Sequence, residues 1–215
     1  MKAVKNWFAR RGALPLTAYL LALAVWVVLG AAHCGSDALA KAQGRLTETT
    51  LRVNDWQLVG LAQDGATLAT LDGDPQMIVE DVSGQVVRTL SYTVQFDGEA
   101  REMCLYYTTK VGEDYSADRR IYPQSLGNGR YVYTLPRTSL AALRLDPCSP
   151  EDGKTVTMTM SDIVLNAADT LPAVWQYFVP TWYQAFCLVL YPALAAAAVS
   201  IAAAVIGDAS ARKKK

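Results

Sequence analysis

This chain of 215 residues contains a single histidine, His33. Without another histidine, neither a Ser-His-Asp nor a Cys-His catalytic arrangement can form in the central part of the chain. Zinc ligation by cysteine and histidine is unsupported for the same reason. The sequence also lacks a phosphate-binding glycine loop, and no spacing of its acidic residues marks a glycosidase pair. We therefore expect no enzymatic activity and no catalytic cofactor.

Acidic residues are missing from the first eleven and the last four positions, although the net charge of the chain is zero. These ends carry Lys2, Lys5, Arg10 and Arg11, and Arg212 to Lys215. Between residues 41 and 174, 12 Lys plus Arg face 18 Asp plus Glu, so that segment has a formal charge of −6. A nucleic-acid-binding protein concentrates basic residues on its folded domain, so nucleic acid is not a predicted partner.

Two long runs, Ala13–Ala32 and Tyr183–Ile206, contain no charged residue at all. About 20 helical residues cross a hydrocarbon core of about 30 Å. Lys and Arg flank both runs on the sides of the chain ends, and positive flanks stay in the cytoplasm. Aromatic rings, which prefer the headgroup layer, precede the second run: Trp175, Tyr177, Phe178, Trp182 and Tyr183. We predict a two-pass protein of the cell membrane with both termini cytoplasmic and an extracytoplasmic central domain.

The chain is thus predicted to hold one folded domain between two membrane helices. The predicted segments are a basic cytoplasmic N-terminus (1–12), a transmembrane helix (13–33), a tether (34–45), a β-sandwich (46–168), a juxtamembrane aromatic segment (169–181), a transmembrane helix (182–206) and a basic cytoplasmic tail (207–215). The second helix is rich in alanine, and small residues let helices approach closely in lipid. We expect this helix to contact the first one or a partner.

Three other interpretations of the two ends are disfavoured: a cleaved signal peptide, a lipoprotein and a sortase anchor. Ala38-Leu39-Ala40 fits a signal-peptide cleavage site, but the apolar run is longer than the 7–15 residues usual in signal peptides, which favours an uncleaved anchor. A lipoprotein is disfavoured because His33 precedes Cys34 where a small residue is expected. Sortase anchoring is disfavoured because the segment Leu171–Trp175 lacks the Thr-Gly pair that the sortase cleaves.

The central domain has a β pattern throughout. Alternation of apolar and polar residues predicts strands at Trp56–Ala62, Ala66–Leu71, Gln76–Glu80, Gln85–Phe96, Glu102–Thr109, Arg119–Leu126, Arg130–Leu135, Leu143–Asp146 and Lys154–Leu165. Turn signals separate them, among them Asp72-Gly73-Asp74-Pro75 and Gly127-Asn128-Gly129. Only Thr138–Leu143 has the pattern of a helical turn. Short strands at this spacing predict an all-β sandwich or barrel.

Four cysteines are present, and two of them fall in the predicted outer domain. Cys34 and Cys187 lie at the membrane edges, where a small apolar thiol needs no special explanation. Cys104 and Cys148 would be in an oxidising compartment, where a disulfide can form and persist. The spacing is compatible with a disulfide and with two buried free thiols, and both interpretations remain open.

A resemblance rests on short motifs in a fixed order: Asp74-Pro75-Gln76, Leu105-Tyr106-Tyr107, Tyr131–Pro136 and Leu143-Arg144-Leu145-Asp146-Pro147. Over about Asp55 to Leu165 the chain resembles the extracytoplasmic galactose-binding-like, jelly-roll β-sandwich domains of bacterial membrane glycosyltransferases and surface-polysaccharide proteins. The resemblance implies a jelly-roll-like sandwich that binds carbohydrate. Those relatives carry many membrane helices and a catalytic domain, which this chain lacks, so any catalysis would come from a partner.

Six residues are candidates for ligand binding. Arg144 and Asp146 share one strand face, where Arg can donate to sugar hydroxyls and Asp can accept from them; an ordinary ion pair is the competing interpretation. Tyr107 and Tyr115 offer rings with a polar tip, and Arg119 and Arg120 follow Tyr115 in a polar loop. Because neighbouring residues of a strand face opposite ways, Tyr106 and Tyr107 cannot both face a ligand.

Asp72 and Asp74 lie on a glycine turn and could hold a structural calcium ion, which is the only cofactor considered. A calcium loop needs six or more oxygen ligands, and the sequence identifies no others, so an ordinary Asp-Pro turn is the favoured interpretation. We therefore predict a membrane-anchored binding or accessory protein that engages cell-surface glycan or a membrane glycosyltransferase of polysaccharide assembly. The alternative is a structural or regulatory membrane protein whose sandwich and alanine-rich helix contact a protein partner.

Overall fold

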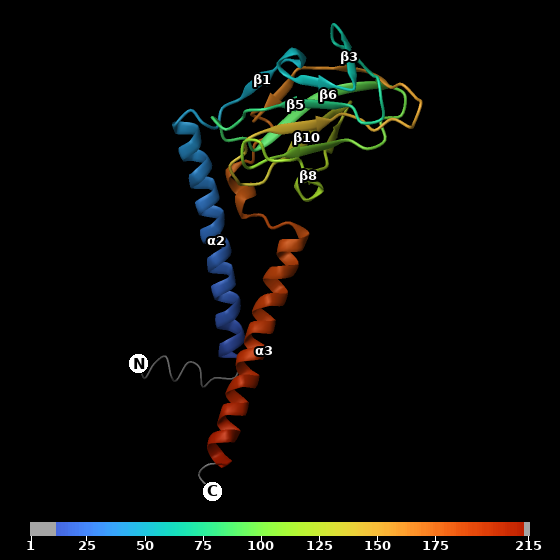
Figure 1. Cartoon of the computed structure of the whole chain (residues 1–215). Coiled ribbons are helices and arrows are strands. Elements are labelled where there is room, and N and C mark those ends of the chain that lie inside the picture. The colour runs from blue at the N-terminus through green and yellow to red at the C-terminus, as the bar shows by residue number, and fades with distance from the viewer. Residues whose placement is uncertain (1–11, 213–215) are drawn as a thin grey trace. The chain divides into compact units, whose positions relative to one another are not determined.

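The computed structural model describes residues 12–212, with side chains up to Ile206. The predicted basic ends, at residues 1–11 and 213–215, lie outside this range. Contacts divide the chain into two units, one with the described residues up to Ser36 and from Pro172 onward, the other Asp37–Leu171. The first unit is helical and the second is a β-sandwich (Figure 1). The predicted fold class, a sandwich with a long apolar helix at either end, is confirmed.

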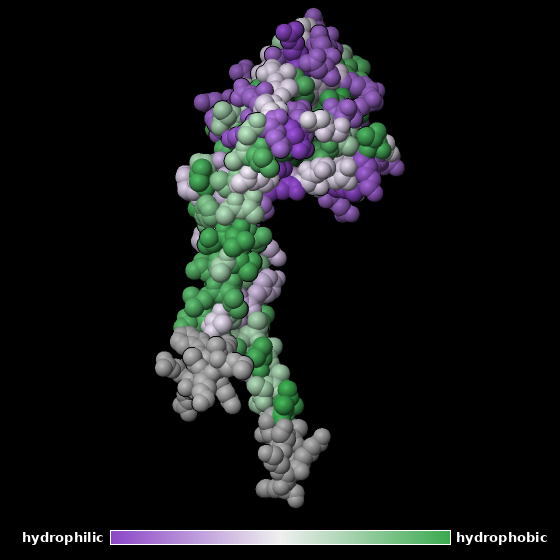
Figure 2. All heavy atoms as spheres, turned by 90° about the vertical axis from the view of Figure 1, so that its left-hand side faces the viewer, coloured by the Kyte–Doolittle hydropathy of each residue, from purple (hydrophilic) through white to green (hydrophobic). Residues whose placement is uncertain are grey.

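Two long helices dominate the first unit. Helix α2 (Ala13–Ala42) and helix α3 (Trp182–Arg212) are both long and apolar enough to cross a membrane by length and composition. Hydrophobic residues cover the helices, whereas hydrophilic residues gather over the sandwich (Figure 2). At the start of α3, Thr181 Oγ1 accepts a hydrogen bond from Gln184 N at 3.3 Å, and Gln184 Oε1 accepts one from Thr181 N at 2.8 Å. This reciprocal capping fixes where α3 begins.

Helix α2 continues through the segment that was predicted as a tether, so the prediction of a tether from residue 34 is wrong. The added residues include Ala38, Leu39 and Ala40, which are strong helix formers. The helix ends at a glycine cap: Gly44 has a φ of +68°, and Gly44 N donates to Lys41 O at 3.0 Å. The helix therefore stops where glycine permits the left-handed turn.

The sandwich has two antiparallel sheets. The larger sheet has the order β1 (Thr49–Leu51), β13 (Ile163–Leu165), β6 (Thr89–Asp97), β12 (Thr157–Met160), β4 (Thr67–Thr70), β3 (Leu61–Asp64), with β10 (Arg130–Thr134) paired to β6 and β9 (Gln124–Gly127) paired to β10. The smaller sheet has the order β2 (Gln57–Val59), β5 (Gln76–Val79), β11 (Leu143–Asp146), β7 (Cys104–Tyr107), β8 (Arg120–Ile121). Short 3-10 helices, η1 (Val53–Asp55), η2 (Ala117–Arg119) and η3 (Val174–Phe178), occur along the chain.

Most predicted strands are present, but three of them are divided. The predicted strand 119–126 splits at Pro123, which cannot donate a backbone hydrogen bond, and its halves β8 and β9 join different sheets. Gly60, with a φ of +64°, separates β2 from β3. Ser161 separates β12 from β13 because its hydroxyl oxygen, in place of a backbone carbonyl, accepts from Thr93 N at 2.9 Å. Strand β1 was not predicted.

The helical turn predicted at Thr138–Leu143 is wrong. Ala141 N donates to Thr108 O at 2.9 Å, and Thr108 N donates to Ala142 O at 3.0 Å. Leu140 and Ala141 are both buried. The segment is extended because its backbone groups pair with a distant segment instead of closing a local turn.

The core lies between the two sheets. Its completely buried side chains come from strands of both sheets: Leu68, Met77, Leu90, Leu105, Tyr133, Leu143, Leu145, Met158, Ile163 and Leu165. On β11, Leu143 and Leu145 enter this core, so Arg144 between them faces away from it. The hydrophobic alternation of β11 therefore determines which side of the smaller sheet carries polar groups.

Asn166 is a buried polar residue whose side chain is fully hydrogen-bonded. It is 1% exposed and has a φ of +56°. Its Oδ1 accepts from Arg88 N at 2.7 Å, and its Nδ2 donates to Thr47 O at 3.1 Å and to Val86 O at 2.8 Å. One side chain thus closes three backbone groups at the end of β13.

We expect Asn166→Gly to lower the free energy of unfolding by about 2–4 kcal/mol, because glycine tolerates the positive φ but leaves three buried backbone groups without partners. Asn128→Gly is the matched control: Asn128 has a φ of +52° and is exposed. We expect that control to change stability by less than about 1 kcal/mol. Urea unfolding of the full chain in detergent, followed by near-ultraviolet circular dichroism, measures both. Equal effects of the two variants would contradict the assigned role of the amide group.

Candidate functional site

Strand pairing in the smaller sheet aligns three polar side chains in one row. Arg144 on β11 lies opposite Tyr106 on β7, and Tyr106 lies opposite Arg120 on β8. The Arg144 guanidinium carbon lies 5.0 Å from the centre of the Tyr106 ring. Opposed residues of neighbouring strands point to the same face of a sheet. The row therefore lies on the outer face of the smaller sheet, away from the core.

Arg144 holds two carboxylates. Its Nε donates to Asp146 Oδ1 at 2.7 Å and its Nη2 to Asp146 Oδ2 at 2.8 Å, a two-pronged contact. Nη2 also donates to Asp74 Oδ1 at 3.0 Å. Asp146 is only 7% exposed, and this burial raises the pKa of its carboxyl, while the hydrogen bond from Arg144 opposes the increase. The ion pair expected between Arg144 and Asp146 is present, at the base of a pocket.

Arg120 forms a second ion pair on the same face. Its Nη1 lies 2.9 Å from Glu102 Oε1, and its guanidinium carbon lies 4.9 Å from the centre of the Tyr122 ring. The Tyr122 hydroxyl donates to Glu102 Oε1 at 3.2 Å. Tyr122 is 55% exposed, so its ring is available to a ligand at the edge of the site.

These side chains surround a polar pocket of about 130 Å³. The pocket, hereafter the Arg144 pocket, is lined by Asp74, Glu102, Cys104, Tyr106, Arg120, Arg144, Asp146, Cys148 and Ser149. Three carboxylates and two guanidiniums give it a formal charge of −1. Desolvated ionisable groups that converge on a cleft are a recognised mark of a functional site.

Cys104 and Cys148, the two cysteines of the outer domain, are free thiols in this structure, and both line the pocket. The Cys104 thiol lies 3.8 Å from Asp146 Oδ2 and is oriented toward that carboxylate. Burial raises the pKa of Cys104 to about 11 and that of Cys148 to about 12, and the Asp146 charge adds to both shifts. Both thiols are therefore protonated at neutral pH, and a protonated thiol is a poor nucleophile.

Among the remaining predicted ligand residues, Tyr107 packs against the core and does not line the pocket. Tyr106 occupies the outward position instead, because the register of β7 against β11 puts it beside Arg144. Tyr115 is half-buried and does not line the pocket; burial raises its pKa, and the charge of Arg144 partly opposes this increase. Arg119 is paired with Glu113, outside the pocket.

The turn with Asp72 and Asp74 has the geometry of an ordinary Asp turn. Asp72 Oδ1 accepts from Asp74 N at 3.0 Å. Asp74 accepts from Gln76 Nε2 at 2.6 Å and from Arg144. Within residues 12–212, no three His, Cys, Asp or Glu residues are grouped so that they could hold a metal ion. The two carboxylates predicted as calcium ligands are thus bound by protein donors, and Asp74 belongs to the Arg144 pocket.

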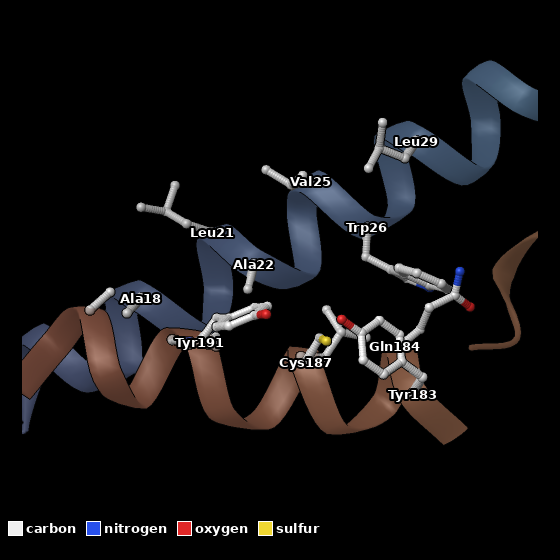
Figure 3. A pocket seen from close by; sticks show the side chains of 13 residues that line it. Ala18, Leu21, Ala22, Val25, Trp26, Leu29, Tyr183, Gln184, Cys187 and Tyr191 are labelled. Carbon is white, nitrogen blue, oxygen red and sulfur yellow. The ribbon is translucent and has the colours of Figure 1, made fainter. Parts of the chain in front are cut away.

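The helical unit contains a larger, apolar cavity of about 650 Å³ between α2 and α3 (Figure 3). Trp26 Nε1 donates to Phe178 O at 3.2 Å, and the Tyr19 hydroxyl donates to Val189 O at 2.9 Å. Gly30 approaches so closely that a Cβ there would lie 2.8 Å from the Phe178 ring. The second helix contacts the first, as predicted, through the Tyr19 hydrogen bond and the lining of this cavity. Trp26 and Gly30 contact Phe178 of η3, which precedes α3.

Searches with the sequence found no matching family model and no matching curated protein. Three solved structures with partial similarity are all carbohydrate-binding modules. A low-affinity xylan-binding module, CBM86, from Roseburia intestinalis is 14% identical over 55% of this chain and 94% of its own, with a TM-score of 0.39. A mutant of a family 29 module is 12% identical over 59% and 98%, with a TM-score of 0.41. A Clostridium stercorarium module in complex with cellobiose is 12% identical over 55% and 85%, with a TM-score of 0.28.

We expect alkylation of Cys104 and Cys148 in the folded protein to be very slow at pH 8. A pKa that rises from 9.0 to about 11 lowers the thiolate fraction of Cys104 about 100-fold. Because the thiols deprotonate more easily when the chain is unfolded, their contribution to stability is complete below about pH 9 and is lost as the pH rises toward 11. Peptide mass spectrometry after iodoacetamide treatment, with and without urea, measures each cysteine separately. Equal rates in both conditions would contradict the burial argument.

Proposed function

We propose that this protein is a membrane-anchored binding protein whose sandwich engages glycan at the Arg144 pocket. The observation that carries this proposal is the row of Arg144, Tyr106 and Arg120, in which each guanidinium lies against an aromatic ring and a carboxylate. Vicinal sugar hydroxyls need donors and acceptors side by side. The ion pairs supply both, and the exposed Tyr122 ring offers an apolar face to a sugar ring.

Charge and size restrict the ligand. With a formal charge of −1, the pocket disfavours phosphate backbones and favours a neutral or amino sugar. Its volume of about 130 Å³ is below the range of about 300–1,000 Å³ that encloses drug-sized ligands. The pocket therefore suits one sugar residue, with the rest of an oligosaccharide passing over the outer face of the smaller sheet.

Binding without catalysis is supported by the chemistry of the buried groups. The pKa values of Cys104 and Cys148 are raised to about 11 and about 12, which keeps both thiols protonated at neutral pH. Asp146 accepts two hydrogen bonds from Arg144, so its carboxylate is engaged and not poised to attack. The pocket groups are thus suited to hold hydroxyls in place.

The membrane part of the proposal rests on the two long apolar helices and on the flanking charges. We propose a two-pass arrangement in the bacterial cell membrane, with the sandwich on the extracytoplasmic side, where cell-surface polysaccharide is found. A glycosyltransferase of polysaccharide assembly is a second proposed partner of the same site, since it would present the same sugar. Co-purification from membranes separates the two, because only the second needs a stable protein partner.

We expect Arg120→Ala to weaken glycan binding about tenfold, because it removes a charge-assisted donor and leaves Glu102 unpaired. Arg130→Ala is the matched control: Arg130 also pairs with a carboxylate, Asp169, and its side chain is 35% exposed against 33% for Arg120. A glycan array of neutral, amino and acidic oligosaccharides, probed with the full chain in nanodiscs, selects the ligand, and titration gives the affinities. Absence of binding, or equal losses in both variants, would sink the proposal.

We expect tags at both ends of the chain to resist protease added outside spheroplasts, while the sandwich is cut, because the Lys and Arg of the flanks keep both ends inside. Permeabilised spheroplasts are the control, in which the tags must also be lost. Cleavage of either tag in intact spheroplasts would refute the two-pass arrangement with both ends inside.

A further inference from the structure

A second polar pocket of the sandwich has the opposite charge. It has a volume of about 370 Å³ and is lined by Arg45, Arg88 and Arg137 together with hydroxyls of Ser83, Thr138 and Ser139. No carboxylate is among its lining residues. It shares no residue with the Arg144 pocket, so it is hereafter called the Arg88 pocket.

Two of these arginines, Arg88 and Arg137, form ion pairs with one buried carboxylate, that of Asp37. The Asp37 side chain is 3% exposed, and its Oδ1 lies 3.0 Å from Arg88 Nε and 3.0 Å from Arg137 Nη1. Arg137 also contacts the second oxygen of Asp37, so its guanidinium is oriented by a two-pronged contact. The negative charge of Asp37 faces the positive charges of Arg88 and Arg137, and Arg45 adds a third positive charge. These four residues, hereafter the Arg88 cluster, have a formal charge of +2.

The donors that remain point to an anionic ligand. The Arg88 side chain is 12% exposed, and only its Nε has a hydrogen-bond partner among the described residues. Among the described residues, Trp56 Nε1 is the only fully buried side-chain nitrogen or oxygen that lacks a hydrogen-bond partner. The Nη atoms of Arg88 have no partner there either, so they are not fully buried and they reach the open pocket. Arg45 is exposed and forms no ion pair with any described residue. Planar guanidinium groups match phosphate oxygens two at a time.

A purely structural role explains the contacts of Asp37 with Arg88 and Arg137, but it does not explain Arg45. Asp37 is satisfied by the Nε of Arg88 and the fork of Arg137, and it needs no third cation. Arg88 is largely buried and its charge is only partly compensated, because Asp37 is shared with Arg137, so an anion at the pocket would stabilise it. We propose that the Arg88 pocket binds a phosphate group, with Arg45 and Arg88 as charged donors and the hydroxyls of Thr138 and Ser139 as further ones. The Ser83 hydroxyl already donates to Asp81 Oδ1.

Two sources can supply that group: free phosphate, or the headgroup of an anionic phospholipid. The second is plausible from the chain itself, because Asp37 follows the apolar run Ala13–Ala32 by only five residues. The inference goes beyond glycan binding and uses different residues. Its free-phosphate arm depends neither on the membrane nor on the Arg144 pocket, so its failure is distinguishable from failure of the proposed function.

The test uses the full chain in a phosphate-free detergent, titrated calorimetrically at fixed ionic strength with inorganic phosphate and with dihexanoyl-phosphatidylglycerol. Arg45→Gln is compared with Arg52→Gln, an exposed arginine outside the pocket. Both variants remove one positive charge, so they share any diffuse electrostatic effect. Arg45 takes no part in the Asp37 contacts, and its replacement leaves the buried ion pairs in place.

We expect saturable binding that Arg45→Gln weakens about tenfold and that Arg52→Gln leaves within twofold. Saturation by both probes would support a site for the phosphate group itself, and saturation by phosphatidylglycerol alone would support the lipid headgroup as its source. Equal losses in the two variants, or no saturable binding of either probe, would overturn the proposal.

Discussion

The pairing of β11 with β7, and of β7 with β8, is the constraint on which the Arg144 pocket depends. Leu143 and Leu145 are completely buried, so β11 can present Arg144 only to the outside. The register then brings Tyr106 and Arg120 into line with Arg144. A shift of one residue in the pairing of β11 would send the leucines outward and the arginine into the core. The hydrophobic core therefore fixes the polar site, and the two share the Cys148 side chain.

Charge is arranged in two opposite ways on one sandwich. The Arg144 pocket is lined by three carboxylates and two guanidiniums, whereas the Arg88 pocket is lined by three guanidiniums, two of which pair with one buried carboxylate, Asp37. Each site has one mostly buried arginine, Arg144 or Arg88, and low exposure strengthens its interaction with a ligand of complementary charge. The two proposed ligands differ accordingly, a neutral or amino sugar at the first site and a phosphate group at the second.

Hydrogen bonds and close packing join the described segments of the helical unit. Side-chain donors on α2 meet backbone carbonyls at Val189 and Phe178, and Gly30 permits the close approach. In a hydrocarbon environment, such hydrogen bonds and small-residue contacts are what hold helices together, because the solvent offers no hydrophobic driving force. From the alanine-rich part of α3, Ala195 lines the cavity between the helices.

The sequence by itself determined the sandwich class, the two apolar helices and most strands, because hydrophobic periodicity and glycine or proline turns are local signals. It also pointed to Arg144 and Asp146, since alternation puts them on one face. Only the tertiary structure decided that Tyr106 and not Tyr107 joins them, that Asp74 binds Arg144, and that α2 continues to Ala42. Those outcomes depend on strand register and on ion pairs such as Asp37 with Arg88, which connect residues far apart in the chain. No local pattern encodes such contacts, because their partners are chosen only when the sheets pair.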